Sequence, residues 1–181
     1  YGSLLSVLDF TKTDMGGRLL KNWLIYPLKD KTQINNRLDF VEELLNNKSK
    51  LNLIIEMLKQ INDLERILSR IASGLSNPRD LISLKVSLKN TLKIKHYLLN
   101  FDSKLAQNIQ KNISTKLQVL VSIIDQAIID EPPINTKEGG IIKLDYNKEL
   151  STLKNSISTD EDWVFSLEEI ERKRTGINTL K

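Results

Sequence analysis

The chain has 181 residues, no cysteine, and 27 lysines and arginines against 23 aspartates and glutamates. The absence of cysteine excludes disulfides, thiolate chemistry and sulfur-based zinc sites in these residues. Charges of both signs are interspersed, so a net charge of +4 does not by itself argue for nucleic-acid binding. No apolar run approaches the roughly 18 residues that span a bilayer, and the length fits one domain, or one domain with an extension.

Helical periodicity dominates from the start of the chain. Thr13 is a predicted N-cap of a helix that ends before Pro27, and Trp23, at helical spacing with leucines, is predicted to lie in the core. Asp30, followed three residues later by Gln33, resembles a capping box and predicts a second helix. A polar break at residues 46–49 separates this helix from a third, which carries an apolar stripe through residues 51–61.

The next helices have clear start signals. Asp63 is predicted to cap a short helix that stops at Gly74. Asn77 and Pro78 predict the start of a long helix, because proline fits the first helical position. Its leucine stripe predicts a buried face, and its many lysines predict a solvated outer face. A further pair of helices is predicted between about residues 103 and 129.

The pattern changes near residue 130. Pro132 and Pro133 forbid a helix, and Gly139 and Gly140 predict a tight turn, so residues 132–145 are expected to form a short hairpin or an ordered loop. One last long helix is predicted from about residue 147 to residue 174. Its apolar stripe fades into the charged residues 168–174, which is typical of a helix that projects into solvent or awaits a partner.

Three stretches, residues 4–30, 63–81 and 129–150, resemble the core domain of the MutS family of DNA mismatch repair ATPases. A fourth segment, residues 171–177, resembles the family sequence that leads out of its long helix. Phe10, Gly17 and Asp145 depart from the family pattern, which puts local loop geometry in doubt. The positions that carry the resemblance in the three stretches are Leu8, Asp9, Thr11, Thr13, Met15, Gly16, Arg18, Leu19, Leu20, Trp23, Pro27, Leu28 and Asp30, then residues 63–66, Arg70 and 77–81, then residues 131–133, Gly139, Gly140, Tyr146, Asn147, Glu149 and Leu150.

The resemblance implies an all-α fold. A multi-helix core bundle would occupy residues 1–145, a lever helix residues 146–176, and the start of a DNA clamp region residues 177–181. The chain would be a fragment that links the clamp to the ATPase region of a longer protein, an expectation that also fits Tyr1 in place of an initiating methionine. The lever helix would lack its returning neighbour, so Leu153, Ile157, Val164 and Leu167 are expected to be exposed, frayed or paired with another copy.

The parent protein implied by the resemblance is a cytoplasmic, nucleoid-associated dimer that recognises mispaired DNA and couples this to ATP. Its partners would be mismatched double-stranded DNA and a second MutS subunit, without a membrane, and the fragment alone would be able to self-associate through the lever helix. ATP and Mg would bind elsewhere in the parent, so no cofactor and no catalytic residue are expected here. The lack of a GxxxxGK[ST] motif agrees with this expectation.

Two groups of charged residues are candidate site residues. The first surrounds the short fourth helix and the start of the fifth, where a hydrogen-bonded network would fix helix geometry more than it adds stability. Rigid helix crossings would suit a segment that transmits motion. The second group lies at the end of the lever helix and is a candidate for proximity to DNA, against the simpler role of favouring the helix C-terminus. The first group comprises Asp63, Glu65, Arg66, Arg70, Arg79 and Asp80, and the second Lys173, Arg174 and Lys181.

Other motifs favour structural roles. His96, the only histidine, has no ligand set around it in sequence, which argues against a metal or general-base role. The acidic residues 160–162 are better explained as a solvated turn than as a cation site. Gly139 and Gly140 lack the lysine and the following helix of a phosphate cradle. Two further hypotheses remain open from the residues alone, namely a free-standing helical protein-interaction scaffold and a small helical enzyme.

Overall fold

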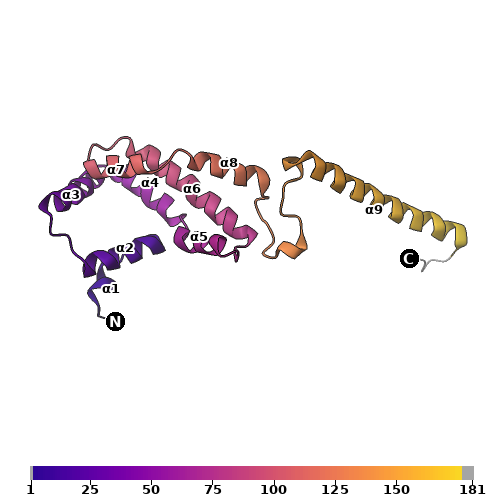
Figure 1. Cartoon of the computed structure of the whole chain (residues 1–181), viewed down its shortest axis with the longest axis horizontal. Helices are drawn as coiled ribbons and strands as arrows, with labels where there is room; N and C mark the ends of the chain where they lie inside the picture. Colours follow the sequence, from indigo (N-terminus) through magenta and orange to yellow (C-terminus); the bar gives the residue numbers. More distant parts are fainter. Residues whose placement is uncertain (1, 177–181) are drawn as a thin grey trace. The chain divides into compact units, whose positions relative to one another are not determined.

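The computed structural model describes residues 2–176, apart from the side chains of residues 158–162, 164, 165, 168 and 169. Within this part the chain is helical and contains no strand, which confirms the predicted all-α class. The α-helices are α1 (Leu4–Leu8), α2 (Asp14–Ile25), α3 (Lys31–Asn46), α4 (Lys48–Lys59), α5 (Leu64–Ala72), α6 (Pro78–Leu98), α7 (Lys104–Asn112), α8 (Leu117–Ala127) and α9 (Lys148–Thr175), with short 3-10 turns η1 (Thr136–Glu138) and η2 (Leu144–Tyr146) (Figure 1).

Helix starts follow the capping residues that the sequence provides. At most of them a short polar side chain accepts a hydrogen bond from a backbone N–H of the first turn, which would otherwise have no partner. Asn77 and Asp80 form a complete capping box at the start of α6. The capping residues with this bond at α1, α2, α3, α5, α6 and α9 are Ser3, Thr13, Asp30, Asp63, Asn77 and Asn147.

The chain divides into two compact units, Tyr1–Ile141 and Ile142–Lys181. In the first unit α6 is the central helix, with α4 and α8 packed along it (Figure 1). Leu84 and Leu88 of α6 and Val121 and Ile124 of α8 are buried. A second cluster at the far end of α6 consists of Ile54, Leu98, Phe101 and Ala106, where the Phe40 ring packs edge-on against Phe101.

Two expectations for the first unit are wrong. Lys85 lies on the predicted outer face of α6 but is only 5% exposed, because α8 and the residues after it cover this position. Trp23 is 40% exposed instead of lying in the core. The guanidinium of Arg37 lies 3.6 Å from the centroid of the Trp23 ring, so a cation–π contact covers part of the indole.

The sequence predicts either a short hairpin or an ordered loop at residues 132–145. The structure has the ordered loop. Within the first unit, the Ile129 N–H donates to the Ile141 carbonyl at 3.0 Å. Pro132 and Pro133 have no N–H to give to a ladder, and Gly139 and Gly140 adopt positive φ values of 71° and 65°. These residues therefore favour turns over paired strands.

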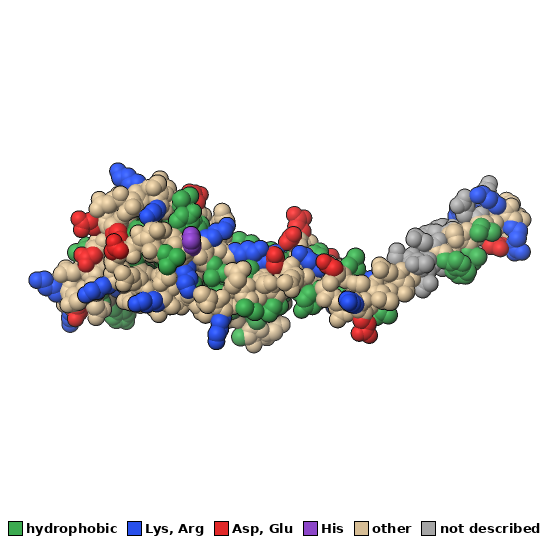
Figure 2. Space-filling model, turned by 90° about the horizontal axis from the view of Figure 1, so that it is seen from above, with side chains coloured by type: hydrophobic (Ala, Val, Ile, Leu, Met, Phe, Trp, Pro, Cys, Tyr) green, Lys and Arg blue, Asp and Glu red, His purple; other side chains and the backbone are tan. Residues whose placement is uncertain are grey.

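The second unit consists of η2 and α9. Asn147 caps α9, and Gly176 ends it in the left-handed conformation. Leu153, Ile157 and Leu167 are exposed, which confirms the expectation for these three residues, whereas the side chain of Val164 lies outside the described residues. Apolar and basic side chains both face solvent along this helix (Figure 2).

Candidate functional site

The first joint between helices connects α2 to the start of α5. The Arg18 guanidinium donates to both carboxylate oxygens of Asp63, at 2.8 and 2.7 Å, and to Glu65 at 2.5 Å. This hydrogen bonding by Arg18 lowers the pKa of Asp63 to about 2 and raises the pKa of Arg18 itself. Asp63 also caps α5 by accepting the Arg66 N–H, so one carboxylate both starts a helix and ties it to another.

The turn before α2 is held by hydrogen bonds of its own side chains. The Asp9 carboxylate accepts the hydroxyl of Thr11 at 2.6 Å and its backbone N–H at 3.0 Å, and these bonds lower the pKa of Asp9. Thr13 caps α2 through the Gly16 N–H. A Cβ on Gly16 would lie 2.9 Å from the Thr13 hydroxyl oxygen, so this position requires glycine unless the cap shifts.

The second joint connects α5 to the start of α6. Arg70 donates through Nε to Asp80 at 3.0 Å and through Nη2 to the other oxygen of the same carboxylate. The Asp80 carboxylate also accepts the Asn77 N–H at 3.0 Å, and its side chain is only 8% exposed. The hydrogen bond from Arg70, more than that from Asn77, lowers the pKa of Asp80.

The third joint holds the residues after α8 against α6. Lys85 contacts Asp125 at 3.0 Å and Asp130 at 2.9 Å, and Lys89 also contacts Asp125, at 3.1 Å. Burial alone would lower the pKa of Lys85, but the bonds to Asp130 and Asp125 raise it. In turn, hydrogen bonds from Lys85 and Lys89 lower the pKa of Asp125 to about 2.

A strap, defined here as residues 128–133, continues this joint. The Arg79 Nε donates to the Pro132 carbonyl at 3.0 Å, and the Pro132 side chain is fully buried. Two cations of α6, Arg79 and Lys85, thus hold both ends of the segment from Asp130 to Pro132. The strap is therefore fixed to α6 by polar bonds as well as by packing.

The predicted network is in fact divided among these joints. Asp63 and Glu65 belong to the first, Arg70 and Asp80 to the second, and Arg79 to the third. The guanidinium of Arg66 forms no ion pair with any described residue and acts on Asp63 only at longer range.

The basic residues near the end of α9 lie in its last turn. Lys173 and Arg174 are exposed, and Arg174 pairs with Glu171 at 2.8 Å. Lys181 lies outside the described residues. Their proximity to DNA stays a prediction.

Sequence reasoning missed the partners that complete the joints, namely Arg18, Lys85, Asp125 and Asp130. The four-residue spacing of Lys85 and Lys89 is a signal for one shared helix face. No local pattern, however, indicates that aspartates some 40 residues later would meet that face. The described residues contain no cluster of three or more histidine and carboxylate side chains that could hold a metal ion.

Comparison with known proteins agrees with this helical architecture. The profile of the family "MutS domain III" matches residues 1–174. The chain is 46% identical over 180 residues, 99% of its length, to the DNA mismatch repair protein MutS of Halothermothrix orenii, and 46% identical over the same share to that of Clostridium botulinum strain Okra. It spans about a fifth of the length of these relatives, 20% and 19% respectively. None of the described helices is long and apolar enough to cross a membrane. By the family match and this identity, the chain belongs to the MutS family of DNA mismatch repair proteins, as its domain III.

Proposed function

We propose that this chain is the core and lever portion of a mismatch repair protein, and that it links a DNA clamp to an ATPase region. The parent protein would recognise mispaired double-stranded DNA as a dimer with a second MutS subunit and would couple this recognition to ATP. The observation that carries the proposal is the set of three polar joints at helix ends, in a chain that matches domain III over residues 1–174.

The joints support a role in transmission because each of them restricts the angle between two elements. Arg18 and Arg70 each place a guanidinium on both oxygens of one carboxylate, which fixes orientation as well as distance. Lys85 fixes the strap to the central helix. A displacement at one end of such an assembly moves the other end instead of being absorbed between helices.

In this proposal the chain itself performs no catalysis. ATP and Mg would be held by other regions of the parent protein. Lys173 and Arg174 would lie near the DNA backbone, where exposed cations contribute a salt-dependent attraction. The role of the chain is to couple two distant sites, each of which biases its position.

The proposal is tested in the parent protein with Arg70→Met and Lys85→Met, and with Lys59→Met as the matched control. Within the described part of the chain Lys59 pairs only with Glu56, and both side chains are exposed. We expect basal ATP hydrolysis and mismatch binding without nucleotide to stay within about twofold of wild type. The stimulation of ATP hydrolysis by mismatched DNA should fall by about fivefold or more in the two joint variants, within the usual range of coupling energies.

Unchanged stimulation in both joint variants would contradict the transmission role. A second assay uses the 181-residue chain alone, which should neither turn over ATP nor prefer a mismatched duplex. Robust ATP turnover by the chain would refute its non-catalytic assignment.

A further inference from the structure

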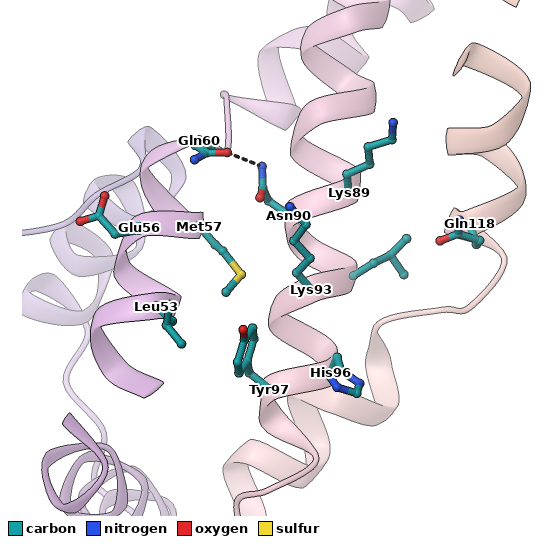
Figure 3. A pocket seen from close by; sticks show the side chains of 11 residues that line it. Leu53, Glu56, Met57, Gln60, Lys89, Asn90, Lys93, His96, Tyr97 and Gln118 are labelled. Carbon is teal, nitrogen blue, oxygen red and sulfur yellow. Dashed lines mark hydrogen bonds between the residues drawn. The ribbon is translucent and has the colours of Figure 1, made fainter. Parts of the chain in front are cut away.

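We propose that a groove over α6 docks an acidic amphipathic helix of a partner protein. The groove has a volume of about 700 Å³ and is lined by residues of α4, α6 and α8 (Figure 3). Leu53, Met57 and Tyr97 give it an apolar floor between α4 and α6. At one end the Asn90 amide donates to Gln60 at 3.2 Å, which closes the groove there.

One positive charge beside the groove is not balanced by a carboxylate of the described residues. Lys85, Lys89 and Lys93 form a row along α6 at four-residue spacing. Asp125 and Asp130 neutralise the first two, whereas Lys93 is exposed and has no carboxylate partner in the described part of the chain.

The one acidic residue that lines the groove does not change this balance. Glu56 pairs with Lys59 at 2.6 Å. The exposed His96 lies about one turn beyond Lys93, and both basic and hydrophobic side chains lie near it on this face (Figure 2). The complementary ligand therefore carries a carboxylate next to an apolar surface.

The backbone of the groove determines which kind of peptide can bind. Nearly all lining residues lie inside helices, so their N–H and C=O groups are already bonded along the helix. An extended peptide would find no backbone partners here, and a phosphate would find no cradle of free N–H groups. A helix satisfies its own backbone and can lay side chains at positions i, i+3 and i+4 onto the floor formed by Leu53, Met57 and Tyr97.

The test is a selection of peptides against the 181-residue chain. The probe is a displayed library of 14-residue peptides with a fixed helical stripe of leucines and randomised positions beside it. We expect the enriched peptides to carry Asp or Glu at one fixed offset from the stripe. Their affinity should fall by about tenfold for Lys93→Glu, and should be unchanged for Lys111→Glu, an exposed lysine on α7 outside the groove.

A second variant, Met57→Lys, places a charge in the floor and should abolish binding, with circular dichroism used to check that it folds. Failure to enrich any peptide would overturn the proposal. So would peptides that bind wild type, Lys93→Glu and Met57→Lys equally, because these would occupy another apolar surface. A dimer of the chain that is lost in Lys93→Glu would assign the groove to a second copy instead of a partner helix.

Discussion

Replacing Arg70 by methionine is expected to destabilise the core through Asp80. The substitution removes two hydrogen bonds to a carboxylate that is 8% exposed and leaves it only the Asn77 N–H. Bonds to charged groups contribute about 1.5–3 kcal/mol each when buried, and exposed ion pairs about 0–1 kcal/mol. Because the Arg70 side chain is 41% exposed, we expect a total loss of about 2 kcal/mol in the free energy of unfolding.

Thermal and urea denaturation followed by circular dichroism measures this loss. A chain of this size should show a Tm lower by about 4–8 °C. The effect should also depend on pH. The folded-state pKa of Asp80 lies below its unfolded value, so the ion pair stabilises the native state above about pH 4, and this contribution is lost as the pH falls through the folded pKa.

A double-mutant cycle isolates the pair. In an Asp80→Asn background the Arg70 substitution should cost much less, because no carboxylate remains to be stranded. Lys59→Met serves as control and should change stability by less than about 0.5 kcal/mol, since both partners of its ion pair are exposed. An equal loss from Arg70→Met in the wild-type and Asp80→Asn backgrounds would refute the reasoning.

Three further predictions concern the other joints. Lys85→Met should lower the free energy of unfolding by about 1–2 kcal/mol in urea, because it removes the buried partner of two aspartates; a loss below about 0.5 kcal/mol would argue against the joint. The free energy of unfolding should fall as the pH is lowered from about 4 to about 2, because the pKa of Asp125 is about 2 in the folded state and near 4 in the unfolded state. This fall should be smaller in Lys85→Met. Gly16→Ala should lower the Tm, because a new Cβ there would lie 2.9 Å from the nearest atom. Gly17→Ala should leave the Tm unchanged or raise it, because the nearest atom lies at 3.3 Å and alanine favours a helix. Equal Tm values for the two variants would contradict the packing around the α2 cap.

Most of the helices after Thr13, and the starting residues of those with a side-chain cap, could be predicted from sequence because both depend on local chemistry; α1 (Leu4–Leu8) was not predicted. Thr13, Asp30, Asp63 and Asn77 each satisfy N–H groups within the next three residues, so the pattern is complete within one turn. The left-handed end of α5 at Gly74 follows equally from a residue without a Cβ. Tertiary structure had little opportunity to override these signals.

The joints could be predicted only in part because their partners are distant in sequence. Asp63 and Asp80 were recognisable as charged residues beside helix ends, but Arg18 lies 45 residues before Asp63. Lys85 shows the same limit. A lysine in a lysine-rich helix is predicted to be solvated, and its burial is possible here because Asp125 and Asp130 pair with it.

The Asp63 carboxylate accepts the Arg66 N–H in the first turn of α5, and the Asp80 carboxylate accepts the N–H of Asn77, the N-cap of α6. Each carboxylate also accepts hydrogen bonds from an arginine of another helix. Twisting either pair of helices would pull on the same oxygen atoms that keep the turn wound. Each joint would therefore yield only when a capping hydrogen bond breaks, and not by gradual bending. A molecule built in this way would switch between discrete shapes.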